Sequence, residues 1–171
     1  MPVQLHILTG NKRHPLMLKE AERGNIARYH LDFANDIGLV LANEFIFGGI
    51  FDRFPGLKLV IGEYEVSWVP FWLFRAEQLH DSFAVEYGMT SAKRRPREYL
   101  AQIYFGVVDD PNIAHVQGIV APDHLLWGSD FPHARNTFPN SHAIVKRVFR
   151  HLGEKGIGAV AYDNAARLFG V

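Results

Sequence analysis

The chain has 171 residues, 48% of them apolar and 21% charged, which is ordinary for a soluble globular domain with its own hydrophobic core. Its 18 basic and 18 acidic side chains cancel, so we expect no nucleic-acid partner and no anionic-membrane partner. The absence of cysteine excludes disulfides, thiolate metal sites and a cysteine nucleophile, and without a recognisable signal peptide we expect a cytoplasmic protein.

The first predicted strand is Pro2–Leu8 (PVQLHIL), with His6 near its carboxyl end and a polar loop after it. From Ile26 to Phe54 apolar residues recur every three or four positions, which predicts helix. Two glycines, Gly48 and Gly49, mark the end of this pattern. The most apolar stretch, Ile37 to Phe51, is too short and too polar to span a bilayer.

The second predicted strand is Leu57–Gly62 (LKLVIG), and Glu63 follows it directly. A helix is predicted over Ser67–His80, where the many aromatic side chains are typical of packing against a sheet. The long connection Ser82–Arg97 ends in four cations within five residues (KRRPR). Such a run can bind an anion, but it is more typical of a solvated loop, and the neutral total charge favours the loop.

The third predicted strand is Ile103–Val108, closed by Asp109 and Asp110, with a helix expected over Asn112–Val120. The fourth is the short run Leu125–Trp127, after which Gly128, Ser129 and Asp130 follow at once. Two helices complete the chain at about Ser141–Leu152 and Ala159–Phe169, separated by breaks expected at Gly153 and Gly156.

Strands and helices thus alternate four times, and the strands are continuous apolar runs rather than alternating ones. That pattern is typical of a parallel sheet covered on both faces, so the fold class is α/β. Four βα units suit either a small doubly wound sheet or half of an eight-stranded barrel. No glycine-rich phosphate-binding motif follows the first strand.

Polar side chains occupy equivalent positions on several strands: His6 late in the first, Glu63 after the second and Asp130 after the fourth. Parallel strands point their carboxyl ends to one edge, so these groups would converge there, together with Asp109 or Asp110 and with His133. Imidazole plus carboxylates suits Zn²⁺ or general acid–base chemistry. Two plainer interpretations stay open: Asp130 caps a turn or the next helix, and His6 is a hydrogen-bonded core residue.

Four segments together resemble the amidohydrolase-related family, the family of aminocarboxymuconate-semialdehyde decarboxylase. Phe54–Glu63, continued by Trp68–Pro70, is similar to the region of the family's sixth strand, and Trp127–His133 (WGSDFPH) resembles its eighth-strand motif. Asn164–Gly170 (NAARLFG) resembles its C-terminal helix, and Pro2–Ile7 its fifth strand. The resemblance covers residues 1–171 as a single partial domain and implies strands five to eight, the C-terminal half of a TIM (β/α)8 barrel.

The resemblance also implies roles. His6 would be a metal ligand, and Asp130 would ligate the metal and act as a base. Glu63 stands where many members carry a metal-binding histidine and a subgroup carries glutamate. The His-x-His motif of the family's first strand has no counterpart in this chain, so we expect a divalent metal, Zn²⁺ first, to be held weakly or to be absent from this chain.

The leading functional expectation is a metal-dependent hydrolase or decarboxylase acting on a small carboxylated or cyclic substrate, with Asp130 as catalytic residue and His6, Glu63 and Asp130 around the metal. The alternative is a non-catalytic half-barrel. A half-barrel leaves open sheet edges, so we expect a homodimer or pairing with a missing N-terminal half. Candidates for its apolar inner face are Leu5, Leu59, Ile61, Phe105, Val107 and Leu126, with the face unassigned.

Overall fold

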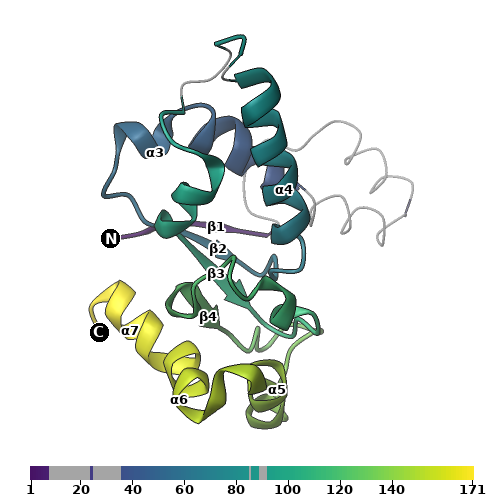
Figure 1. The fold of residues 1–171 in the computed structure, drawn as a ribbon. Helices are drawn as coiled ribbons and strands as arrows, with labels where there is room; N and C mark the ends of the chain where they lie inside the picture. Colours follow the sequence, from purple (N-terminus) through teal and green to yellow (C-terminus); the bar gives the residue numbers. More distant parts are fainter. Residues whose placement is uncertain (8–23, 25–35, 85, 89–91) are drawn as a thin grey trace.

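A computed structural model describes residues 1–7, 24, 36–84, 86–88 and 92–171. Four strands form one parallel sheet in the order β1-β2-β3-β4, which confirms the expected α/β class. The strands are β1 (Val3–His6), β2 (Leu59–Gly62), β3 (Ile103–Val107) and β4 (Leu125–Trp127). Figure 1 shows them side by side with β1 and β4 at the two edges. Neighbouring strands in the sheet are also successive in the chain, as in one half of a (β/α)8 barrel.

The helical segments are mostly short. They are η1 (Leu41–Ile46), α3 (Ile50–Arg53), α4 (Val69–Leu79), η2 (His80–Ala84), η3 (Pro96–Gln102), η4 (Ile113–Val116), η5 (Pro122–His124), α5 (Ser141–Val148), η6 (Arg150–Leu152), α6 (Gly153–Gly158), η7 (Ala159–Asp163) and α7 (Asn164–Phe169). Residues 36–40 are helical and run into η1. In the part of the chain that the structure describes, no helix is long and apolar enough to cross a membrane.

Several helix boundaries differ from the predictions. The helix expected over Ile26–Phe54 is interrupted at Gly48, where a Cβ would lie 2.4 Å from the Asn43 carbonyl oxygen, so only glycine fits; the part of this prediction before residue 36 lies outside the described residues. The helix expected over Asn112–Val120 is reduced to the single turn η4. Gly156, expected to break a helix, lies inside α6.

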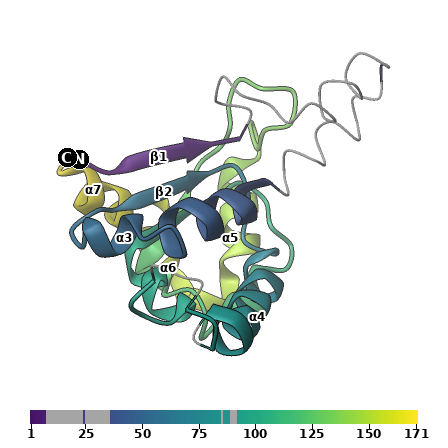
Figure 2. The ribbon, with the colours of Figure 1, turned by 90° about the horizontal axis from the view of Figure 1, so that it is seen from above.

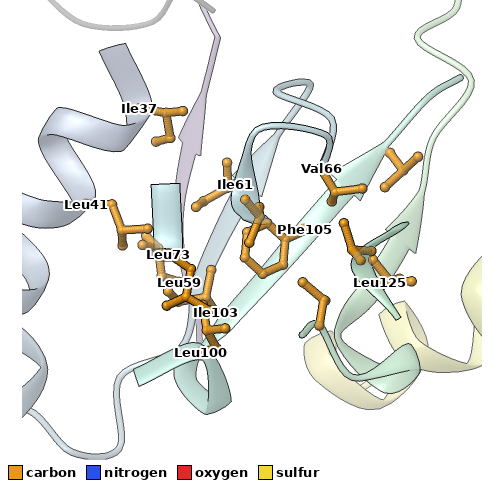
Figure 3. Close-up of a cluster of buried hydrophobic side chains, with 14 of the residues drawn as sticks. Ile37, Leu41, Leu59, Ile61, Val66, Leu73, Leu100, Ile103, Phe105 and Leu125 are labelled. Carbon is orange, nitrogen blue, oxygen red and sulfur yellow. The ribbon is translucent and has the colours of Figure 1, made fainter. Parts of the chain in front are cut away.

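The hydrophobic core lies between one face of the sheet and helices from both halves of the chain, and Figure 3 shows part of it. Ile37, Leu41 and Leu73, from helices in the first half of the chain, pack with strand residues such as Leu59 and Ile61, all of them almost fully buried. Val145 and Val160, from helices in the second half, belong to the same core. In Figure 2 the helices α3 and α4 lie to one side of β1 and β2. Burial of these side chains contributes about 1.5–3 kcal/mol each to the stability of the domain.

The six candidates for the inner face do not share one face. Leu5, Leu59, Ile61, Phe105 and Val107 all belong to the core on the helix side. The Leu126 side chain lies on the opposite face of the sheet. There it lines a cavity together with Gln4, His6, Val60, Gly62 and Gly106. This second set, here called the cavity face, corresponds to the interior of a barrel. The sequence could not separate the two sets because apolar residues occupy both faces of the buried strands.

Candidate metal centre at the carboxyl edge of the sheet

Glu63 leaves the end of β2 in a left-handed backbone conformation, with φ of 63°. The strand before it is buried along its whole length, so Glu63 is the first side chain of this segment to reach the edge of the sheet. Its Oε1 lies 3.3 Å from Nε2 of His6, which ends the neighbouring strand β1. A non-glycine residue at such a φ carries strain of roughly 1–2 kcal/mol, which is common at functional sites.

The His6 ring is oriented by its own strand. Its Nδ1 lies 3.0 Å from the carbonyl oxygen of Ile7. A proton on Nδ1 donated to that carbonyl leaves Nε2 as the nitrogen that faces Glu63, the arrangement found in metal-binding histidines.

Asp130 comes from the far edge of the sheet. The N–H of Gly128 continues the ladder of β4 by donating to Val107 at 3.1 Å, and two residues later the chain turns with φ of 57° at Asp130. Its side chain is only 14% exposed, and its Oδ1 lies 2.7 Å from Nδ1 of His133. The N–H of His133 also donates to the Asp130 carbonyl at 2.9 Å, so one turn brings the imidazole back over the carboxylate.

Glu63, Asp130 and His133 each offer a ligand atom, and these atoms lie within 4.8 Å of one another. His6, Glu63 and Asp130 line one cavity of about 290 Å³ on the cavity face of the sheet. The structure therefore brings the three predicted side chains together. His133 lies with them. The sequence analysis predicted His133 at this edge but did not predict it as a ligand. Its position three residues after Asp130 is the sequence feature that could have indicated that role.

The carboxyl groups of Glu63 and Asp130 are in contact, which favours a cation or a proton between them. Burial raises the pKa of Glu63, its hydrogen bond with Asp130 raises it further, and the nearby His6 lowers it. Two carboxylates in contact cannot both be ionised without a positive partner between them. The two carboxylates and the His133 imidazole, whose ligand atoms converge, are donors that Zn²⁺ and Mn²⁺ both accept, so they fit a divalent metal ion. The predicted ligand His6 is not in this converging group and lies beside Glu63.

Neither aspartate after β3 reaches this cavity. Asp110 is 1% exposed, and its Oδ2 accepts hydrogen bonds from the backbone N–H groups of Val66 at 2.9 Å and Ser67 at 2.8 Å. Asp109 forms an ion pair with Arg147 instead. The expectation that one of them joins the site is wrong, because unpaired backbone donors in the loop after β2 bind the nearer carboxylate.

Two of the four cations in the run after Ser82 form ion pairs with carboxylates. Arg95 contacts Glu77 at 2.8 Å and Asp81 at 2.9 Å, and Arg94 lies 3.4 Å from Asp52. These pairs join the run to α4 and α3, and they support the loop interpretation over an anion site.

Comparisons with known proteins point in one direction. A family model described as amidohydrolase matches residues 2–171. Over 63 residues the chain is 38% identical to 4-sulfomuconolactone hydrolase of Rhizobium radiobacter, which covers 34% of this chain and 21% of that protein.

Solved structures match over more of the chain. The 5-carboxyvanillate decarboxylase of Novosphingobium aromaticivorans, solved with bound manganese, superposes with a TM-score of 0.78 at 17% identity, covering 99% of this chain and 48% of that one. The 5-carboxyvanillate decarboxylase of Sphingomonas paucimobilis gives 0.61 at 26% identity, covering 74% and 38%. The chain thus spans less than half the length of each of these relatives.

Proposed function

Because this chain belongs to the amidohydrolase family, we propose that it forms the metal-binding half of an enzyme that acts on a small carboxylated or cyclic substrate, with decarboxylation as the leading reaction. The observation that carries the proposal is the meeting of Glu63, Asp130 and His133 within 4.8 Å, beside His6. These side chains come from three different strand ends, so only the fold brings them together.

His6, Glu63 and Asp130 would hold a divalent ion, with His133 as a further donor. When bound, the ion supplies a Lewis acid that polarises a carboxylate or carbonyl oxygen of the substrate. Mn²⁺ and Zn²⁺ both suit the donors; Zn²⁺ is the sequence expectation, and the manganese in a structural relative supports Mn²⁺.

Asp130 is the residue placed to move a proton. Its Oδ1 is held at 2.7 Å by Nδ1 of His133, which is exposed and can exchange protons with water. In a decarboxylation, Asp130 would deliver a proton to the carbon that loses CO₂; in a hydrolysis, the same oxygen would accept a proton from water.

The cavity favours a substrate with an apolar ring. Val60, Leu126 and Phe169 contribute apolar surface to its lining, and no lysine or arginine is among the described residues that line it. A substrate carboxylate would therefore find its positive partner at the metal centre rather than on the cavity wall. This arrangement supports decarboxylation, in which the reacting carboxylate lies at the ion. Hydrolysis of a cyclic ester is the second candidate, supported by the partial identity to a lactone hydrolase.

Titration of the purified chain with Mn²⁺ and with Zn²⁺, followed by calorimetry, tests the proposal. We expect one weak site, which Asp130→Asn weakens by about tenfold or more, corresponding to about 1.4 kcal/mol. The matched control is Asp109→Asn, because Asp109 pairs with Arg147 outside the cavity. An affinity that Asp130→Asn leaves unchanged would contradict the assignment.

The reaction itself is tested by CO₂ release from 5-carboxyvanillate and 2,6-dihydroxybenzoate, and by acid release from a muconolactone, on the chain in its native assembly. Release of CO₂ that depends on the added metal is the expected result. Metal binding without turnover of either substrate class would favour the non-catalytic half-barrel.

A further inference from the structure

Gly62, the last residue of β2, lies directly beside His6 of the neighbouring strand. The two residues are partners in the parallel register of β1 and β2, which Figure 2 shows side by side. The N–H of Ile7 donates to the Gly62 carbonyl at 3.2 Å, so the main chain holds this register up to the edge of the sheet. Both Gly62 and His6 line the cavity. Any side chain at position 62 would therefore share the cavity face with the His6 ring.

The space that a side chain would occupy at Gly62 is already filled. A Cβ at this position would lie 3.0 Å from Cδ2 of His6 and 3.1 Å from Nε2 of Gln4. Both distances are shorter than van der Waals contacts between carbon atoms, which are about 3.5–4.0 Å. The His6 ring and the Gln4 amide thus lie against the bare α-carbon of Gly62, and a larger residue there would displace them.

The His6 ring cannot move away from Gly62 without losing a contact. Its Nδ1 lies 3.0 Å from the Ile7 carbonyl oxygen, and its Nε2 lies 3.3 Å from Oε1 of Glu63. Because Cδ2 is bonded to Nε2, a displacement of Cδ2 moves Nε2 as well. The Gln4 side chain is exposed and flexible, so it can rotate aside. An added methyl group at position 62 would therefore act mainly on the place of His6 Nε2.

The strand β2 has little room to move toward β3 and relieve this contact. On β3, a Cβ at Gly106 would lie 3.2 Å from the Ile61 carbonyl oxygen and 3.3 Å from the Gly62 α-carbon. The main chain of β2 already lies so close to Gly106 that even one added carbon would crowd it. Gly62 is thus held between β1 and β3, and its lack of a side chain leaves the room that the His6 ring occupies.

We propose that Gly62 is a positioning residue of the candidate metal centre, because its bare α-carbon lets the His6 ring lie across the end of β2 with Nε2 toward Glu63. The role in metal binding rests on the proposed function, whereas the placement of the ring does not. Groups that orient a metal ligand without touching the metal commonly change metal affinity by about 10–100-fold. A residue with a side chain at position 62 would have an effect of this kind through His6.

The placement of the ring is tested by nuclear magnetic resonance without metal. One α-proton of Gly62 points in the direction of the absent Cβ and therefore toward Cδ2 of His6. We expect a nuclear Overhauser cross-peak between this proton and Hδ2 of His6 in the natural chain. Absence of the cross-peak would overturn the placement and the proposal with it.

A double-mutant cycle of Gly62→Ala and His6→Ala separates an effect on the His6 ring from an effect on the main chain. We expect Gly62→Ala to change the urea midpoint of unfolding less favourably in the natural background than in the His6→Ala background, where the methyl group finds room. Gly56→Ala is the matched control, because a Cβ at Gly56 has no atom within 4 Å. Equal effects of Gly62→Ala in both backgrounds would overturn the proposal.

Calorimetric titration with Mn²⁺ tests the role in metal binding. We expect Gly62→Ala to bind Mn²⁺ about tenfold more weakly than the natural chain, and Gly56→Ala to bind it equally well. In the His6→Ala background, Gly62→Ala should weaken binding no further. Unchanged affinity in Gly62→Ala would overturn the proposal. A natural chain that binds no Mn²⁺ would instead overturn the proposed function and the role of Gly62 in it, while the cross-peak and the stability cycle would still decide the placement of His6.

Discussion

Glu65 and Asp110 each bind backbone N–H groups in the loop that carries the other. The Glu65 carboxylate accepts hydrogen bonds from the backbone N–H groups of Val108 at 3.1 Å and Asp109 at 3.0 Å, in the loop after β3. Asp110, in that loop, binds the N–H groups of Val66 and Ser67 in the loop after β2. The two loops are thus joined by reciprocal contacts that begin two residues after Glu63 in the chain. Glu65 also has a left-handed φ of 54°, which these hydrogen bonds help to maintain.

Replacement of Asp110 by asparagine should destabilise the fold strongly. The carboxylate is buried and accepts hydrogen bonds from the N–H groups of Val66, Ser67 and Asn112. An amide NH₂ would face some of these donors, so we expect a loss of about 3 kcal/mol in the free energy of unfolding. Urea denaturation measures it. Asp109→Asn is the control, and an equal small effect of both variants would contradict the role given to Asp110.

Glu65 should make stability depend on pH. Burial raises the pKa of Glu65, hydrogen bonds from Asp109 and Val108 lower it, and the carboxylates of Asp110 and Asp109 raise it, with a net rise above the ordinary value of 4.5. The folded protein therefore binds this proton more tightly than the unfolded chain. The Glu65 contribution to stability is fully present below pH 4.5 and is lost as pH rises through the folded pKa.

The matched measurement is the free energy of unfolding of the natural protein and of Glu65→Gln across this pH range. Glutamine stays neutral, so the natural protein should lose stability relative to the variant as the pH rises. A difference between the two proteins that does not change with pH would show that Glu65 has the same pKa in both states.

The left-handed conformation of Glu63 predicts an unusual preference for glycine. Glu63→Gly and Glu63→Ala both remove the carboxylate, so their difference in stability reports the backbone alone. At φ of 63° we expect the glycine variant to be more stable than the alanine variant by about 1 kcal/mol, the reverse of their order in an ordinary strand. Thermal unfolding of the two proteins side by side gives the answer, and a more stable alanine variant would argue against the left-handed conformation.

Asn164 should be essential for attaching the last helix. Its side chain is 1% exposed and donates to the carbonyls of Pro122 at 2.9 Å and Leu125 at 2.8 Å. Asn164→Ala leaves two carbonyls without this donor, so we expect a loss of about 2–3 kcal/mol by denaturant unfolding. Asn112→Ala is a suitable comparison because the Asn112 side-chain bond to Ser67 is exposed. Similar losses in both variants would contradict the prediction.

The sequence by itself determined the four strands, their parallel arrangement and the edge at which His6, Glu63 and Asp130 meet. Continuous apolar runs separated by helical spacing are typical of a covered parallel sheet. Glu63 and Asp130 follow such runs, and His6 lies near the carboxyl end of another. The family motifs lie at the same positions, and the match over residues 2–171 confirms the family they indicated.

Only the tertiary structure decided which carboxylates face the cavity. Asp109, Asp110 and Asp130 look alike in the sequence, since each follows an apolar strand. Asp110 accepts hydrogen bonds from backbone donors in a loop more than 40 residues earlier. Asp130 itself adopts a left-handed backbone conformation, and its side chain lies beside Glu63. Those choices depend on where unpaired N–H groups from distant segments come to lie, because a buried polar group must find its partner in the folded chain and local spacing does not specify it.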